Sequence, residues 1–210
     1  RDAQESRGLG DVYKRQLESR RDFRNEQTFT IDPNGSEELD DAIHFKTLSD
    51  GHVEIGVHVA DVSHFVKPSS MVDREAKKRG SGVYLMNRTV KMLPPKISSE
   101  ICSLSPGEER YTVSVVFKIN PDTGRVLDED TWIGKAIIKS TGKVSYDQVD
   151  SIINGQGNSG LDDERASQIE MLHSISQKLR QARFGEGTSN NQPLRLIYQL
   201  DDENVPVEHN

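Results

Sequence analysis

Five acidic side chains stand within ten residues of this chain, in the segment Asp32-Pro-Asn-Gly-Ser-Glu-Glu-Leu-Asp-Asp41. The segment holds no basic residue, and its Pro-Asn-Gly sequence is typical of a turn. Carboxylates packed this closely repel one another, so a cation or access to water must relieve their charge. Oxygen ligands at short range suit Mg²⁺, which keeps several waters and often binds a phosphate oxygen as well. The segment therefore points to metal-dependent chemistry on the phosphodiester bonds of a nucleic acid.

An acidic run is also typical of a solvated loop or of a helix start, and this simpler interpretation competes with a metal site. The flanking segments favour the site. Residues 28–32 enter the run and residues 41–48 leave it, and both are rich in the β-branched and aromatic residues of strands. Acids held at strand ends beside a core are typical of functional sites.

The elements that must position these acids follow from periodicity and turn signals. Further strands are predicted over 52–60, 82–85, 111–119, 125–140 in two segments, and 194–200. Helices are predicted over 70–79, 98–104, 146–153 and 161–184, and the last presents Ile169, Leu172, Ile175 and Leu179 on one face. Polar residues 155–160 and 185–192 are expected to be connecting loops. The predicted fold class is mixed α/β (α+β), with a twisted, mixed, largely antiparallel sheet flanked by helices.

Composition bounds the class of protein. The chain has 210 residues, a formal net charge of −7 and one cysteine. It has no apolar run of the roughly 18 residues that a membrane span requires, so no membrane association is expected. The acidic balance does not favour a globally basic nucleic-acid surface. Basic residues are nevertheless frequent between Lys67 and Lys143, where they could line a groove beside an acidic site or form ordinary solvated faces.

The cysteine count also bears on the compartment. Cys102 alone excludes a disulfide framework and suits a reducing environment. We expect it to be a small buried thiol, and we expect a cytoplasmic protein, with the nucleus as the alternative.

Six short motifs occur in a characteristic order: Arg21-Asp-Phe-Arg24, Phe29-Thr-Ile-Asp-Pro33, Leu39-Asp-Asp-Ala-Ile43, His58-Val-Ala-Asp-Val62, Met92-Leu-Pro94 and Ile101-Cys-Ser-Leu104. Together they resemble the catalytic (RNB) domain of the ribonuclease II / ribonuclease R family. The resemblance runs from about residue 20 to residue 210. The segment Lys143-Val-Ser-Tyr-Asp147 is most similar to the eukaryotic members, both exosome-associated and exosome-independent.

This resemblance implies a processive, metal-dependent 3′→5′ exoribonuclease. Such an enzyme hydrolyses single-stranded RNA and releases nucleoside 5′-monophosphates. The resemblance assigns the metal site to Asp32, Glu38, Asp40 and Asp41, with one or two Mg²⁺ ions, or Mn²⁺ in their place. Asp32 and Asp41 are expected to be direct ligands, and Asp40 to serve the chemical step or a second metal. Single-stranded RNA is the expected partner, with the exosome as a further candidate.

Four more residues are expected to contact RNA. The resemblance matches Tyr84 to a tyrosine that stacks on a base, and Tyr146 to a catalytic-centre tyrosine that holds the 3′-terminal nucleotide. Packing roles, in a core strand for Tyr84 and at a helix cap for Tyr146, are the alternatives. Arg88 and Lys91, in the basic stretch, are also expected to bind RNA.

Glu38 departs from the family pattern, which has aspartate at this place. Its carboxylate reaches about one methylene further, and Mg²⁺ tolerates little error around about 2.0–2.1 Å. A displacement of about 1 Å can cost on the order of 10²-fold in rate. Because the family includes relatives that bind RNA without cleaving it, a catalytically inactive RNA-binding protein is the alternative function. An unrelated acidic domain is a third hypothesis.

Other polar residues are expected to be structural. Asp61 closes a strand and is predicted to make a structural hydrogen bond. His58 is, like Asp61, a candidate ligand of the acidic site, but a structural hydrogen bond is the favoured interpretation for both. His44 and His64 are expected to have ordinary roles. Asp162, Asp163 and Glu164 should charge the first turn of the last helix, where the helix dipole favours acids.

The two ends of the chain are unusual. Residues 1–16 look like translated adapter from a sequencing library, and we expect them to lie outside the native fold. The chain stops at Asn210 without a helix stop or a tail. We therefore expect residues 17–210 to be the N-terminal part of an RNB catalytic domain.

Overall fold

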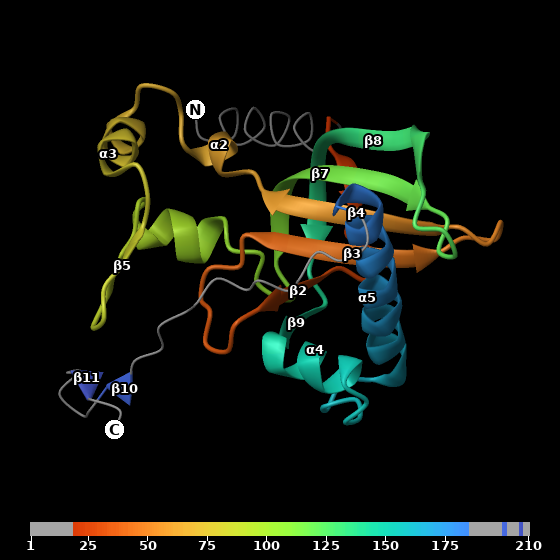
Figure 1. The fold of residues 1–210 in the computed structure, drawn as a ribbon. Helices are drawn as coiled ribbons and strands as arrows, with labels where there is room; N and C mark the ends of the chain where they lie inside the picture. The colour runs from red at the N-terminus through yellow and green to blue at the C-terminus, as the bar shows by residue number, and fades with distance from the viewer. Residues whose placement is uncertain (1–18, 185–198, 201–205, 208–210) are drawn as a thin grey trace.

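A computed structural model describes residues 19–184, 199–200 and 206–207 of the chain (Figure 1). The predicted loop over 185–192, most of the predicted strand over 194–200 and the segment 1–16 lie outside these ranges. The strands are β1 (Arg21–Phe23), β2 (Phe29–Asp32), β3 (Asp41–Thr47), β4 (Val53–Ala60), β5 (Val83–Tyr84), β6 (Thr89–Val90), β7 (Glu109–Ile119), β8 (Val126–Lys139), β9 (Gly142–Ser145), β10 (Gln199–Leu200) and β11 (Pro206–Val207). The helices are α2 (Val62–Phe65), α3 (Met71–Arg79), the π-helical turn η1 (Lys96–Ile101), α4 (Tyr146–Ile153) and α5 (Asp163–Phe184).

A seven-stranded sheet is the frame of the molecule, in the order β1-β8-β7-β4-β3-β2-β9. The inner neighbours pair antiparallel. Each edge strand runs parallel to its neighbour, β1 beside β8 and β9 beside β2. The predicted mixed, largely antiparallel sheet is confirmed. The short edge strands β1 and β9 were not predicted, because segments of three and four residues show no alternation to detect.

Helix α5 crosses one face of the sheet (Figure 1). Its predicted apolar face packs there: Ile175 and Leu179 meet Phe45 and Phe117, while Ile169 meets Phe29. Alternation explains the contact, since odd-numbered residues of β3 point toward α5 and even-numbered ones point away. The opposite face buries a second apolar cluster, made by Phe23, Leu39, Ala42, Leu104, Val116, Ala136 and Ile138.

Two histidines lie inside this second layer. His44 on β3 and His58 on β4 are fully buried, and His44 Nδ1 lies 2.8 Å from His58 Nε2. His58 Nδ1 continues the hydrogen-bonded chain to Ser114 Oγ at 2.7 Å, and His44 Nε2 ends it at Glu54 at 3.3 Å. Gly56 faces the pair, and a Cβ there would stand 2.2 Å from His44 Cε1. Nothing in the sequence pattern predicted that these two histidines pair.

Two predicted elements differ in detail. β8 is one strand, but its ladder with β7 shifts register between Val116, opposite Trp132, and Lys118, opposite Leu127. The polar residues 128–131 stand at this irregularity, which explains why the sequence pattern suggested two segments. The helix predicted over 98–104 is a π-helical turn that begins earlier, at Lys96. The helix predicted over 70–79 is confirmed as α3, with the Ser70 side chain accepting from the Asp73 amide at its start and Gly80 at φ +71° after its end.

Candidate active site

The acidic segment connects two neighbouring strands at one end of the sheet. Asp32 is the last residue of β2, Asp41 is the first residue of β3, and residues 33–40 form the connection. Gly35 turns the chain with φ +79°, a conformation that L side chains rarely adopt. Leu39 anchors the connection, since it is buried and its N–H donates to Ser103 Oγ at 3.1 Å. The predicted placement of acids at strand ends beside a core is confirmed.

The edge strand β9 brings a second segment to the same place. In the parallel β2–β9 ladder, Asp32 stands opposite Ser145. Ser145 caps α4 with a full capping box, so Tyr146 begins the helix directly beside Asp32. The Lys143 ammonium donates to the Ser36 carbonyl at 2.7 Å, and the Asn34 amide donates to the Asp147 carboxylate. Tyr146 and the acidic connection are thus held together across 113 residues of sequence.

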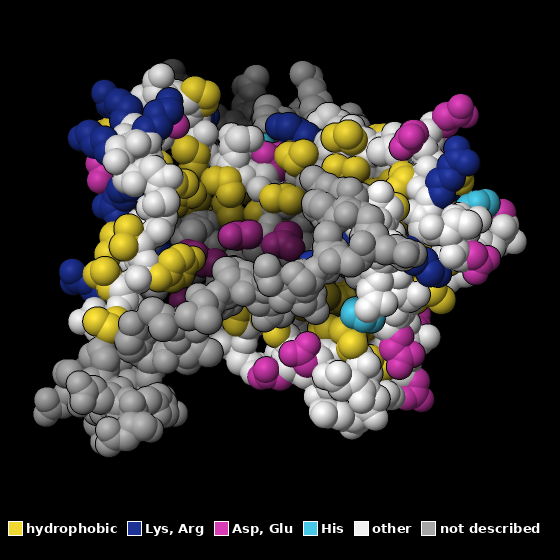
Figure 2. Space-filling view, in the orientation of Figure 1, with side chains coloured by type: hydrophobic (Ala, Val, Ile, Leu, Met, Phe, Trp, Pro, Cys, Tyr) yellow, Lys and Arg dark blue, Asp and Glu magenta, His cyan; other side chains and the backbone are white. Residues whose placement is uncertain are grey.

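A cleft of about 420 Å³ lies beside the acids. Four predicted site residues line it: Glu38, Asp40, Tyr84 and Lys91. Tyr84 projects from the β5–β6 hairpin with 82 % of its surface exposed. Arg88 lies in the turn of that hairpin, outside the lining of the cleft. Figure 2 shows acidic side chains near the middle of this face and hydrophobic side chains to their left, toward the hairpin.

Two of the aspartates, Asp40 and Asp41, have raised pKa values. Burial, and then the charges of Glu38, Asp41 and Asp32, raise the pKa of Asp40 above its usual range. Burial and the charge of Asp32 likewise raise the pKa of Asp41. Asp32 Oδ2 is buried without a hydrogen-bond partner among the described residues. The site therefore concentrates negative charge and leaves one carboxylate oxygen unsatisfied.

Glu38 is held differently from the three aspartates. Its Oε1 lies 3.0 Å from Lys91 Nζ, and Ser99 Oγ donates to the same oxygen at 3.4 Å. Lys91 also donates to Ser99 Oγ at 2.7 Å. Burial acts to raise the pKa of Glu38, but the neighbouring Ser98 hydroxyl, the Lys91 ammonium and the Ser99 hydroxyl outweigh it and hold the pKa below its usual range. Ser98 and Ser99 were missed from the sequence, since nothing in their local pattern marks them.

Within the described residues, no group of three or more histidine, cysteine, aspartate or glutamate side chains has its ligand atoms gathered as in a formed metal site. The charges of the four predicted metal residues act on one another, and Glu38 is in addition paired with Lys91. The predicted roles of the other polar residues fit the structure. Asp61 pairs with the buried Arg20 at 2.7 Å, and Cys102 is a buried thiol at the wall of the cleft. Asp163 and Glu164 stand in the first turn of α5.

The RNB domain model matches residues 20–210 of this chain. The chain belongs to the RNB-domain family. It is 39 % identical over 210 residues to the DIS3-like exonuclease 2 of Xenopus tropicalis, covering 91 % of the chain and 24 % of that protein. It is 36 % identical over 209 residues to the inactive exonuclease DIS3L2 of Arabidopsis thaliana, and the match covers 94 % of this chain and 20 % of that protein. The chain thus spans about a fifth to a quarter of the length of these relatives.

Solved structures agree with the fold. Ribonuclease R of Mycoplasma genitalium, in complex with ribose-methylated single-stranded RNA, superposes with a TM-score of 0.80 at 30 % identity, covering 90 % of this RNB chain and 29 % of that protein. Yeast Ssd1, described as a pseudonuclease, superposes with a TM-score of 0.72 at 30 % identity. The match covers 86 % of this chain and 21 % of that protein. Both named exonucleases and inactive relatives therefore share this fold. In the described part of the chain, no helix combines the length and apolar character of a membrane span.

Proposed function

We propose that this RNB chain carries the acidic half of the active site of a processive, hydrolytic 3′→5′ exoribonuclease. The substrate is single-stranded RNA, and the products are nucleoside 5′-monophosphates. The observation that carries the proposal is the cleft where Glu38 and Asp40 lie with Tyr84 and Lys91. Membership in a family with named exonucleases supports the reaction class.

The residues present fit a divalent cation. Asp32 offers a buried oxygen without a partner, and burial together with the charges of neighbouring carboxylates raises the pKa of Asp40, so positive charge at this place would be stabilised. The donors are hard oxygens, as Mg²⁺ or Mn²⁺ prefers. Asp32, Glu38, Asp40 and Asp41 would hold one or two such ions. When bound, a pair of these ions activates water and stabilises the leaving oxygen of an in-line displacement.

The chain's other residues bind and orient the RNA. Tyr84 presents an exposed ring for base stacking, which is worth about 1–3 kcal/mol per base and does not depend on sequence. Tyr146, beside Asp32, holds the terminal nucleotide against the acids. Arg88 and Lys91 supply positive charge for phosphates, Lys91 from the wall of the cleft. This tolerance of sequence suits an enzyme that moves along its substrate.

A second function is favoured by one observation. Lys91 and Ser99 contact the Glu38 carboxylate, so the side chain that replaces the family aspartate is engaged by a cation and a hydroxyl of the protein. Inactive relatives share the fold. The alternative is therefore an RNA-binding protein that retains the channel without cleavage. For either function we propose a cytoplasmic protein, with the nucleus as the alternative location and the exosome as a candidate partner.

The deciding experiment incubates the full-length protein that contains this chain with 5′-labelled single-stranded RNA, in Mg²⁺ and in EDTA. The exonuclease proposal expects a Mg²⁺-dependent collapse of the label to a short end product. Intact RNA that still shifts in a gel supports the pseudonuclease. RNA that is neither cut nor bound contradicts both proposals.

A further inference from the structure

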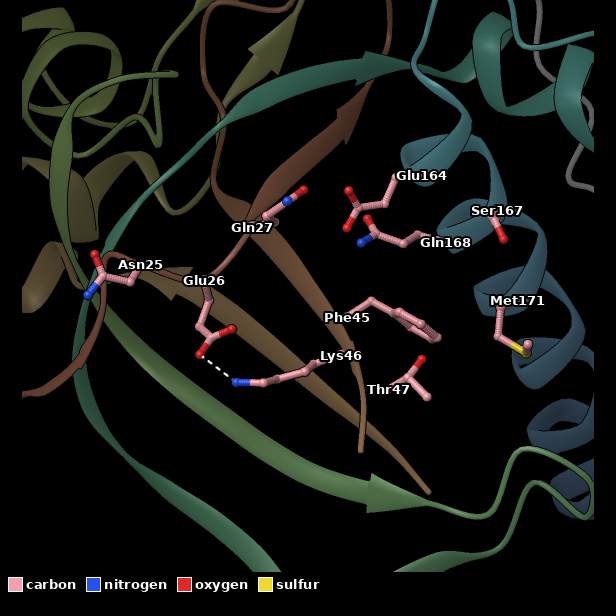
Figure 3. A pocket seen from close by; sticks show the side chains of 10 residues that line it. All are labelled: Asn25, Glu26, Gln27, Phe45, Lys46, Thr47, Glu164, Ser167, Gln168 and Met171. Atoms are coloured by element: carbon pink, nitrogen blue, oxygen red, sulfur yellow. Dashed lines mark hydrogen bonds and ion pairs between the residues drawn. The ribbon is translucent and has the colours of Figure 1, made fainter. Parts of the chain in front are cut away.

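A second pocket, of about 450 Å³, lies away from the acids. It is formed by the loop before β2, the end of β3 and the first half of α5, and it shares no lining residue with the acidic cleft. Figure 3 shows that its two ends differ in chemistry. The side chains of Gln27, Glu164 and Gln168 converge at one end, while Phe45 and Met171 lie at the other.

Gln168 forms the floor of the polar end. Only 9 % of its surface is exposed, and its Oε1 has no hydrogen-bond partner among the described residues. Leaving a buried acceptor unpaired costs on the order of tenfold in a folding equilibrium constant. Arg165, on the preceding turn, does not satisfy this oxygen. Its guanidinium donates to Thr141 Oγ1 at 2.9 Å and lies over the Phe29 ring. Arg165 Nη1 is likewise buried without an acceptor, so the described residues leave one donor and one acceptor of α5 unpaired.

The pocket is acidic at its rim. Glu26 is paired with Lys46 at 3.0 Å, as Figure 3 shows. Glu164 stands one helical turn before Gln168, so both side chains face the same side of α5. Glu164 forms no ion pair within the described residues, and it is exposed. One unpaired carboxylate thus stands above one unpaired amide oxygen.

These features select the chemistry of the occupant. It must carry several N–H donors, a positive charge and a short apolar stem. A guanidinium meets all three requirements, because its rigid fork can donate to a carboxylate and an amide oxygen at once. The carboxylates repel phosphates, so RNA is disfavoured here. The rim residues Lys46, Thr47, Glu164 and Ser167 are exposed, which leaves room for a peptide backbone outside the pocket.

We propose that this pocket receives an arginine side chain of a protein segment. The guanidinium donates to Gln168 Oε1 and to the Glu164 carboxylate, and the aliphatic stem lies against Phe45 and Met171. The inference does not depend on RNA cleavage, so it stands or falls separately from the proposed nuclease.

The test is an NMR titration of the ¹⁵N-labelled chain with acetyl-Gly-Arg-Gly-amide. We expect the side-chain amide signals of Gln168 to shift, and the matched lysine tripeptide to bind at least about fivefold more weakly, since an ammonium lacks the planar fork. No shift at about 10 mM arginine tripeptide, or equal affinity for the two tripeptides, would overturn the proposal.

Two variants and one control sharpen the result. Gln168→Met keeps the side-chain length but removes the acceptor, and it should weaken arginine binding about tenfold without loss of fold stability. Glu164→Gln, on the exposed rim, should weaken binding severalfold and reduce its salt dependence. Glu170→Gln, exposed on α5 but outside the pocket, should change nothing. Unchanged affinity in both pocket variants, or shifts of the Gln168 signals by a single-stranded RNA instead, contradicts an arginine site.

Discussion

The Lys91 ammonium lies 3.0 Å from the Glu38 carboxylate. The sequence predicts that Lys91 binds RNA and that Glu38 binds metal. In the structure the two side chains form an ion pair with each other at the wall of the cleft. The longer glutamate side chain reaches Lys91 and Ser99 from a connection that Leu39 anchors. The glutamate that stands where the family has aspartate therefore pairs with a positive charge at the edge of the acidic site.

Shortening this side chain tests the link. Glu38→Asp withdraws the carboxylate from Lys91 and returns it to the other acids, so the single-turnover rate on 5′-labelled RNA should rise by about tenfold or more. Glu37→Asp is the matched control, because Glu37 is exposed and lies 3.8 Å from Lys91. An unchanged or lower rate in Glu38→Asp would show that glutamate is the functional residue here.

Asp40→Asn separates catalysis from binding. The amide keeps the shape but removes the charge, so turnover should fall by at least about 10²-fold while RNA affinity stays within about twofold. The unfolding temperature should rise, because the raised pKa of Asp40 means that the folded state resists its ionisation. In the wild-type protein, the destabilisation caused by ionised Asp40 is absent at low pH and grows as the pH rises above the usual range of aspartate pKa values. Asp50→Asn, in the β3–β4 turn, is the control. Loss of fold and RNA binding together would make Asp40 a structural residue.

Tyr84→Ala measures the stacking surface. Loss of one stacked base corresponds to about 1–3 kcal/mol, or roughly 5- to 150-fold in affinity for single-stranded RNA. Tyr84→Phe should retain the affinity, since it keeps the ring. Both variants should unfold at the wild-type temperature because the side chain is 82 % exposed. Fluorescence anisotropy with labelled RNA provides the affinities, and equal binding by all three proteins would place RNA elsewhere.

The buried histidine pair predicts a pH dependence of stability. Burial, and then the neighbouring His44, lowers the pKa of His58 to about 3, and burial also lowers the pKa of His44 despite Glu54. Unfolded histidine titrates near about 6.5, so below that pH the unfolded chain binds protons that the folded chain does not. The contribution of neutral His58 to the free energy of unfolding is fully present above about pH 6.5. It should fall by up to about 1.4 kcal/mol per pH unit as the pH drops toward 3.

Urea unfolding at several pH values between about 4.5 and 6.5 checks this dependence. His58→Gln should flatten the slope, and the control His52→Gln should leave it intact, because His52 is partly exposed in the β3–β4 turn. Identical slopes in wild type and both variants would assign the pH dependence to other groups.

Much of the frame was predictable because its signals are local. Alternation marks β3, β4 and β7, and the capping box at Ser145 marks α4. The clustering of acids at the ends of β2 and β3 followed from the short connection between two strands. The partner of Glu38 was not predictable, because Lys91 reaches it across 53 residues through a side-chain conformation that no sequence pattern encodes.

The parallel pairing of β9 with β2 was also not predictable from the sequence. The β9 segment is four residues long, and its pairing with β2 depends on the whole sheet being in place. Only the family resemblance placed Tyr146 near the acids, and the Asp32–Ser145 register now gives the physical reason.

This pairing also sets an order of events during synthesis. The acidic connection leaves the ribosome 113 residues before Asp147, which holds it from the far edge of the sheet. Non-local pairings of this kind form late in folding, because the intervening chain must be ordered first. A nascent chain that ends before β9 therefore carries all four acids without the clamp on their connection, and the site is assembled only after the rest of the sheet has been made.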